Sequence, residues 1–197
     1  MGVGPHEKPW PIGEQYDSEL LENGDRRNVL DKYRYWKVDA IVADLDTKRH
    51  SLSIAIENWQ HDLNIGSVVR TANAFNVSSV HIVGKRDWNR RGAMVTDKYL
   101  HVIHHATVAE FQEWSTENSC PIIGIDNVPG SLPLEKAQLP LRCVLFFGQE
   151  GAGMSNNAIA ACEKIYEISQ FGSTRSMNAS AAAAIAMYAW GMQHLHR

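Results

Sequence analysis

Apolar residues recur with a helical period near the start of the chain. The positions of this stripe are Val29, Tyr33, Val38, Ile41, Val42 and Leu45. Their spacing predicts a helix over residues 26–45 that ends near residues 48–50, and no Gly or Pro interrupts it. Residues 1–25 are polar and rich in Gly and Pro, so they are predicted to be irregular.

After residue 51, short apolar runs alternate with segments of helical pattern. The predicted strands cover residues 52–57, 80–83, 102–104, 122–125, 143–147 and 165–168. The predicted helices cover residues 66–75, 108–114, 156–163 and 178–194. This alternation predicts an α/β fold with a parallel sheet flanked by helices on both faces. Because such sheets bind ligands at the carboxyl ends of their strands, the segments that follow the strands are the informative ones.

Composition limits the class of protein. The chain has 197 residues, of which 44% are hydrophobic, so it can bury a core and is not a disordered chain. We expect an N-terminal extension over residues 1–50, partly helical, and one domain over residues 51–197. The formal net charge of -3 excludes a uniformly basic surface, so any positive surface for nucleic acid must be local.

The cysteines indicate a reducing compartment. Cys120, Cys143 and Cys162 are odd in number and have no C-x-x-C spacing, which disfavours a disulfide framework and a cysteine zinc site. The nine histidines form no convincing metal-ligand pair with a carboxylate, so no metal is expected. No signal peptide and no apolar run of about 20 residues is visible, so we expect a cytoplasmic protein without a membrane span.

Three segments that follow predicted strands carry candidate chemistry. In the first, Asn64 is placed to cap a helix, and Arg70 lies on the second turn of that helix among small and apolar residues. In the second, residues 147–155, three glycines would let the backbone approach a ligand. The third, residues 171–180, is a polar loop that enters the last helix, where free N–H groups suit polar or anionic ligands.

Each segment alone also has an ordinary explanation. Arg70 could be a solvated surface arginine, and the glycine-rich stretch could be a structural turn. The loop before the last helix could be a simple helix cap. The glycine-rich stretch lacks the third glycine of a dinucleotide loop and the lysine of a P-loop, so neither of those sites is indicated.

Together, the three segments closely resemble the SpoU (TrmH-like) branch of the SPOUT superfamily of RNA methyltransferases. The motifs of that family are N-x-G-x-x-x-R, F-G-x-E-x-x-G and S-[LM]-N-x-S-x-A. Here they occur in this order at residues 64–70, 147–153 and 176–182. The resemblance extends from about residue 51 to the C-terminus and leaves the first 50 residues outside it.

The resemblance implies a set of catalytic residues. Arg70 matches the catalytic arginine of the family, and Asn64 supports it. Glu150 matches a glutamate that shapes the site, and Ser176 and Asn178 lie near the methyl donor and the catalytic centre.

The resemblance also implies a cofactor, a knot and a dimer. The cofactor is S-adenosylmethionine, and its adenosyl part would be held by backbone near four residues, with Ser176 and Asn178 beside it. Those four residues are Ile125, Gly148, Ile168 and Met177. The C-terminal segment would form a trefoil knot, and the protein would be a homodimer with the region of the last helix at the interface. The residues of that helix leave open whether its apolar face, with Ile185, Tyr188 and Met192, belongs to the core or to the interface.

The chain departs mildly from the family pattern. Many relatives have a proline soon after the last strand, whereas residues 169–171 contain none. Met177 and Ala179 stand where Leu and Val are common in the third motif. These changes leave the details of the substrate open, and they do not change the class of enzyme.

Methyl transfer to a ribose 2′-hydroxyl needs removal of a proton, because the neutral hydroxyl is a poor nucleophile. Arginine normally stays protonated. Two roles therefore remain open for Arg70: it acts as the base after losing its proton in the assembled site, or it stays cationic and orients the ribose or phosphate.

The positive charge of the chain is concentrated in one segment. Residues 84–105 hold five Lys or Arg and two Asp, a net charge of +3. We expect this segment to follow RNA phosphates, with Trp88 able to stack on a base, and binding should weaken as salt rises. The expected RNA contacts are Lys85, Arg86, Arg90, Arg91 and Arg175.

Two other functions compete with an RNA 2′-O-methyltransferase. One is a catalytically silent RNA-binding protein of the same fold, which the intact motif residues disfavour. The other is an NAD-dependent enzyme, which the missing G-x-G-x-x-G after the first strand disfavours. The sequence does not distinguish transfer RNA from ribosomal RNA as the target, and residues 1–50 are the expected place of substrate choice.

Overall fold

A computed structural model describes residues 2–60 and 64–195 of the chain. The chain divides into two compact units, Met1–Lys48 and Arg49–Arg197. No helix among the described residues is long and apolar enough to cross a membrane.

The first unit contains two short α-helices, α1 (Ser18–Asn23) and α2 (Val38–Asp46), and a 3-10 turn, η1 (Asp31–Tyr33). Asp17 caps α1, because its carboxylate accepts hydrogen bonds from two backbone N–H groups of the first turn. Gly24 ends α1 with a φ of 89°, which glycine adopts at low cost. The prediction that residues 1–25 are irregular is therefore wrong over α1.

The predicted helix over residues 26–45 is wrong in its first half, since α2 begins at Val38. A buried carboxylate explains the difference. Asp25 accepts hydrogen bonds from the Arg27 side chain at 2.6 and 2.9 Å and from the Tyr35 backbone N–H at 3.1 Å. Tyr35 itself has a φ of 63°, which no helix tolerates. The side chain of Asp25 thus holds this stretch in a non-helical path.

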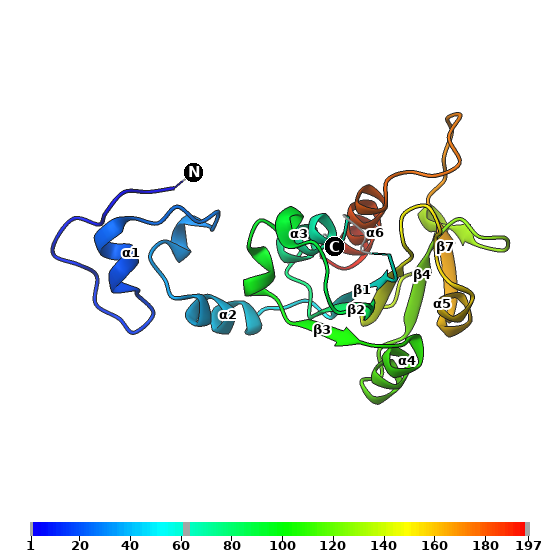
Figure 1. The fold of residues 1–197 in the computed structure, drawn as a ribbon, viewed down its shortest axis with the longest axis horizontal. Coiled ribbons are helices and arrows are strands. Elements are labelled where there is room, and N and C mark those ends of the chain that lie inside the picture. Colours follow the sequence, from blue (N-terminus) through cyan, green and yellow to red (C-terminus); the bar gives the residue numbers. More distant parts are fainter. Residues whose placement is uncertain (1, 61–63, 196–197) are drawn as a thin grey trace. The chain divides into compact units, whose positions relative to one another are not determined.

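The second unit is built on a seven-stranded sheet, and all of its pairings are parallel (Figure 1). The strand order is β3-β2-β1-β6-β4-β7-β5. The strands are β1 (Leu52–Asn58), β2 (Val80–Gly84), β3 (Val102–His105), β4 (Ile122–Ile125), β5 (Leu132–Pro133), β6 (Cys143–Phe147) and β7 (Lys164–Glu167). All six predicted strands are confirmed. The sequence pattern missed β5, because two residues are too short to show a period.

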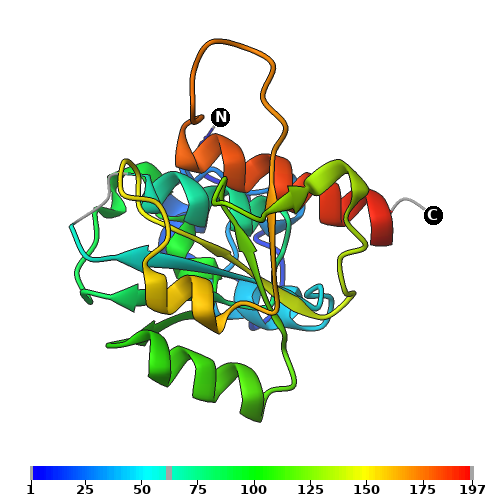
Figure 2. The same cartoon turned by 90° about the vertical axis from the view of Figure 1, so that its right-hand side faces the viewer.

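Helices cover both faces of the sheet, as Figure 2 shows. They are α3 (Ile65–Ala74), α4 (Val108–Glu117), α5 (Asn156–Ala161) and α6 (Ala179–His194), with 3-10 turns η2 (Arg90–Ala93), η3 (Thr96–Tyr99) and η4 (Leu134–Lys136). Helices α3 and α6 pack together on one face, and α4 and α5 lie on the other. The predicted fold class is confirmed in its parallel sheet and flanking helices, whereas the trefoil knot stays a prediction.

Alternate side chains along the strands point into two separate hydrophobic cores, one on each face of the sheet. Ile54 and Ile56 of β1 point to the core under α3 and α6, where Trp190 is also buried. Ala55 points to the opposite core, with Phe111 of α4 and Phe146 of β6. This alternation follows from the two-residue repeat of a strand. The sheet is therefore covered by an apolar core on each face.

A chain of buried polar side chains crosses β1, β2 and β3. Ser53 and Ser79 hydroxyls are 2.9 Å apart, and Ser79 Oγ lies 2.8 Å from His81 Nε2. His81 Nδ1 lies 2.8 Å from His105 Nε2. Burial lowers the pKa of His81 to about 3, helped by the neighbouring His105, and burial also lowers the pKa of His105. Both histidines are therefore neutral near pH 7.

We expect the free energy of unfolding to fall as the pH drops from about 6.5 toward 3. The unfolded chain binds a proton at His81 below its ordinary pKa of about 6.5, and the folded chain does not. Each such histidine costs up to about 1.4 kcal/mol per pH unit in this window. Urea unfolding between pH 7 and 4.5 measures the slope. His81→Asn should make it shallower, the exposed control His101→Asn should not, and equal slopes in all three proteins would contradict this account.

Candidate functional site

A cavity of about 400 Å³ opens at the carboxyl ends of β4, β6 and β7 and at the start of α6. Its walls come from four separate segments of the chain. The lining residues are Ile125, Asp126, Asn127, Val128, Phe147, Gly148, Gln149, Glu150, Gly151, Ala152, Gly153, Met154, Ile168, Gln170, Ser176, Met177, Asn178, Ala179 and Ala182. The six residues expected to hold the cofactor are all in this set.

The register of the sheet brings these segments together. Ile125 at the end of β4 pairs with Phe147 at the end of β6 on one side and with Tyr166 of β7 on the other. The chain segments that leave these three strands therefore begin side by side. Residues more than 40 positions apart in the sequence become neighbours because parallel strands end at one edge.

Backbone contact explains the glycines of the second motif. Gln149 and Gly153 exchange two backbone hydrogen bonds of 3.1 and 2.9 Å, which close a tight loop over the cavity. A Cβ on Gly148 would lie 2.2 Å from the carbonyl carbon of Gly153, so only glycine fits there. Gly153 has a φ of 68°, in the left-handed region that favours glycine.

Two carboxylates that the sequence reading missed anchor this loop. Glu57, fully buried at the end of β1, accepts bonds of 2.7 Å from both the backbone N–H and the hydroxyl of Ser155. Asp126, directly after β4, accepts a 2.7 Å bond from the Met154 N–H. Ser155 also caps α5, since its hydroxyl oxygen accepts a hydrogen bond from the Ala158 N–H. In the sequence, the sign of a buried and functional Glu57 is that this glutamate directly follows the apolar run Ile54–Ile56 of a strand.

One hydrogen-bonded network joins the three motifs. The Asn64 amide donates to a carboxylate oxygen of Glu150. The Asn178 amide donates to Asn64 Oδ1 at 2.9 Å and to Glu150 Oε1 at 3.2 Å. The prediction that the Asn64 side chain caps α3 is wrong, because it makes no capping bond and is used in this network instead.

Asn178 has two roles that require an amide. Its Oδ1 accepts from the backbone N–H groups of Ser180 and Ala181 at 3.0 and 3.3 Å, which caps α6. Its Nδ2 is then left to donate to Asn64 and Glu150. An aspartate could cap the helix but could not donate these bonds. The start of α6 is thereby tied to the other two motifs.

Arg70 lies apart from this network. Its side chain is exposed on α3 and does not line the cavity. The motif glycine four residues earlier serves packing: a Cβ on Gly66 would lie 2.8 Å from both Asn89 O and Ala93 N. The helix that carries Arg70 therefore packs backbone to backbone against residues 89–93, which belong to the positively charged segment 84–105.

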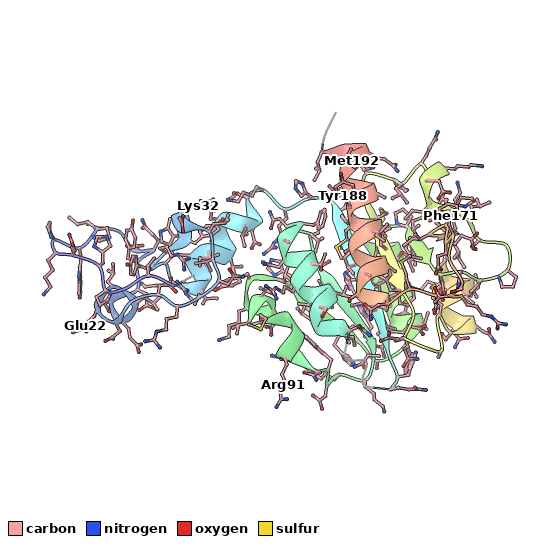
Figure 3. All side chains as sticks on the ribbon, turned by 90° about the horizontal axis from the view of Figure 1, so that it is seen from above. Glu22, Lys32, Arg91, Phe171, Tyr188 and Met192 are labelled. Carbon is pink, nitrogen blue, oxygen red and sulfur yellow. The ribbon has the colours of Figure 1, made fainter. Side chains whose placement is uncertain are left out.

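The basic side chains of segment 84–105 near β2 are exposed, and the backbone that carries them is fixed by hydrogen bonds from Asn58. Asn58 at the end of β1 donates to the carbonyl oxygens of Lys85 and Asp87 at 2.7 and 2.9 Å. Trp88 is half-buried against the core, with Arg90 over its ring at 5.4 Å, so base stacking by Trp88 stays a prediction. All five basic side chains expected to contact RNA are exposed: Lys85, Arg86, Arg90 and Arg91 in this segment, and Arg175 in the loop before α6. Figure 3 shows Arg91 at the surface.

The lining of the cavity suits a ligand with a flat apolar part and a positive charge. Ile125, Phe147 and Ile168 provide apolar surface. Among the described residues, the charged groups of the lining are Asp126 and Glu150, and no basic side chain lines it. An adenosyl group fits the apolar wall, and a sulfonium fits the two carboxylates. No cluster of three or more potential metal ligands occurs within residues 2–60 and 64–195, and the expected absence of a metal stays a prediction.

Comparisons with known proteins point to one group. The model of the SpoU rRNA Methylase family matches residues 51–188. The chain is 24% identical over 176 residues to the tRNA (guanosine(18)-2′-O)-methyltransferase of Borreliella burgdorferi, covering 87% of this chain and 79% of that protein. It is 31% identical over 190 residues to an uncharacterized tRNA/rRNA methyltransferase of Synechocystis, covering 87% of this chain but only 47% of the relative.

A solved structure shares the fold. The SpoU methyltransferase AviRb from Streptomyces viridochromogenes, in complex with the cofactor AdoMet, matches with a TM-score of 0.68 and 21% identity. The match covers 77% of this chain and 61% of that one. This likeness supports the arrangement of sheet and helices in the second unit.

Proposed function

The chain belongs to the SpoU rRNA methylase family, and on this premise we propose that it transfers a methyl group from S-adenosylmethionine to a ribose 2′-hydroxyl of RNA. The observation that carries the proposal is the meeting of three distant motifs at one cavity. Asn64, Glu150 and Asn178 share hydrogen bonds there, and the residues expected to hold the cofactor line the walls.

S-adenosylmethionine supplies an activated methyl group when bound. The chain then has to hold and orient the partners of the reaction. Backbone near Ile125, Gly148, Ile168 and Met177 holds the adenosyl part, and Ser176 lies at the rim of the same cavity. Glu150 favours a cationic ligand and fixes the amides of the other two motifs, so the walls keep their positions.

Arg70 acts on the RNA side of the reaction in this proposal. It is exposed and does not line the cavity, so it is free to meet a ribose or phosphate that approaches from solvent. Two roles stay open: removal of the hydroxyl proton, or orientation of the nucleotide by a permanent positive charge.

Calorimetry with S-adenosylmethionine and with NAD tests the cofactor first. Binding of S-adenosylmethionine alone supports the proposal, and binding of NAD alone would refute it. Mass-spectrometric mapping of ribose methylation, in RNA from cells with and without the protein, then tests the reaction. RNA binding without cofactor binding or methylation would favour the catalytically silent RNA-binding protein.

The RNA target is expected to be a transfer RNA or a ribosomal RNA, because the relatives are named for those substrates. We place the methyltransferase domain at residues 51–197 and substrate choice in the extension, residues 1–50. The first unit contains seven Lys or Arg and ten Asp or Glu, so it would act by shape and specific contacts more than by phosphate binding. A cytoplasmic location belongs to the same proposal.

A homodimer is the proposed form of the enzyme. One side of α6 is buried against the sheet, and the opposite side exposes Ile185, Tyr188, Met192 and Leu195. These residues recur about every three to four positions and form an apolar stripe, and Figure 3 shows Tyr188 and Met192 on α6. Such a stripe, exposed by 38–58%, is typical of a surface that a second copy covers.

Charge on this stripe should separate the two copies. Tyr188→Glu together with Met192→Glu places two like-charged pairs in an apolar interface, and the mass measured by light scattering should fall to that of a monomer. The exposed pair Val102→Glu and Leu132→Glu, on β3 and β5, is the control and should not change the mass. A monomeric wild-type protein would contradict the proposed dimer.

A further inference from the structure

We propose that Phe171 stacks on an RNA base next to the ribose that receives the methyl group. This inference rests on the proposed function, and it adds a recognition residue that none of the three motifs contains. Phe171 lies in the segment between β7 and α6, which leaves the cavity and returns to it.

Two side chains close the base of this loop. Asn127 Nδ2 donates to the carbonyl oxygen of Arg175 at 2.5 Å, and Gln170 Nε2 donates to the same oxygen at 3.4 Å. Gln170 and Ser176 both line the cavity, so the two stems of the loop stand at its rim. Residues 171–174 lie beyond the closure and project from the body, as Figure 2 shows for this orange segment.

Phe171 is 96% exposed at the start of this projecting tip. An exposed phenylalanine ring is unfavourably solvated, and its burial would contribute about 1.5–3 kcal/mol of favourable transfer free energy. The neighbours along the tip are glycine, serine and threonine, followed by Arg175, so the ring lacks an apolar surface around it. An exposed ring and an exposed cation on one loop are the two kinds of side chain with which proteins hold unpaired bases, by stacking and by phosphate contact.

Position favours RNA over a second copy of the chain. Phe171 directly follows Gln170, which lines the cavity, so a base next to a ribose that is methylated there can reach the ring. The apolar stripe of α6 is the surface suited to a second copy, and Figure 3 shows Phe171 well apart from Tyr188 and Met192. A dimer contact would be expected to continue that stripe, and a lone aromatic ring among polar residues does not.

Three variants test the ring. Phe171→Ala should weaken binding to an unmodified transfer RNA transcript by roughly 5- to 150-fold, which is the range for loss of one base stack. Phe171→Trp should keep the affinity, because it keeps an aromatic face. Phe171→Leu should behave like Phe171→Ala, because it is apolar but cannot stack. Fluorescence anisotropy gives the RNA affinity, and calorimetry should give an unchanged affinity for S-adenosylmethionine.

Each contrary outcome has a distinct meaning. Equal RNA affinity in Phe171→Ala and wild type would overturn the inference, as would a Phe171→Leu variant as good as wild type. A change in oligomeric mass with Phe171→Ala would assign the ring to a second copy and would also overturn it. Failure of the proposed function appears elsewhere, as a wild-type protein that binds no S-adenosylmethionine or methylates no RNA.

Discussion

Arg70→Ala is expected to lower the rate of methyl transfer by a factor on the order of 10² to 10⁴, the range for loss of a positioned proton-transfer group. The affinity for S-adenosylmethionine should not change, because Arg70 does not line the cavity. Single-turnover methylation gives the rate of the chemical step, and calorimetry gives the affinity. Arg142→Ala is the matched control, since Arg142 is exposed at the opposite end of β6, and it should keep the wild-type rate.

The dependence of this rate on pH distinguishes the two roles of Arg70. As a base, Arg70 would make the rate rise with pH through an ionisation that Arg70→Ala abolishes. If Arg70 is a permanent cation, its loss in Arg70→Ala would lower the rate by the same factor at every pH, and Arg70→Lys would recover part of the activity. A wild-type rate in Arg70→Ala would remove Arg70 from the reaction altogether.

Gly148→Ala is expected to displace the loop that covers the cavity and so to weaken cofactor binding. The added Cβ would lie 2.2 Å from the Gly153 carbonyl carbon and 2.2 Å from the Met154 nitrogen, and both are backbone atoms of the loop that covers the cavity. The loop cannot yield without losing the two hydrogen bonds between Gln149 and Gly153. Overpacking of this kind costs typically 1–3 kcal/mol, so the affinity for S-adenosylmethionine should fall by about 5- to 150-fold.

The control for this variant is Gly172→Ala. Gly172 lies in the projecting loop next to Phe171, a Cβ there meets nothing within 4 Å, and its φ is not in the left-handed region. Cofactor affinity by calorimetry and the midpoint of thermal unfolding should match the wild type for Gly172→Ala. Both should drop for Gly148→Ala, and an unchanged cofactor affinity in Gly148→Ala would show that this loop does not bound the binding site.

Local patterns in the sequence determined most of the fold of the second unit. The apolar runs at β1, β4 and β6 and the helical stripes at α3 and α6 each lie within one segment, so their periods are readable. Residues 26–37 also carry a helical pattern, but they form no α-helix, and α2 begins only at Val38. In that stretch, the buried carboxylate of Asp25 binds Arg27 and Tyr35 and overrides a helical pattern of side chains.

Some features of the site were likewise readable from the sequence, and others depended on the tertiary structure. Its residue types and their order along the chain were readable in three motifs, and the lining of the cavity includes every residue expected to hold the cofactor. Only the tertiary structure gave Glu57 and Asp126 their place under the glycine loop and Asn64 its bonds to Glu150 and Asn178. These contacts join segments 28 to 114 residues apart. Sequence periodicity reports which face of one element is apolar, whereas strand order and register decide which ends of different elements meet.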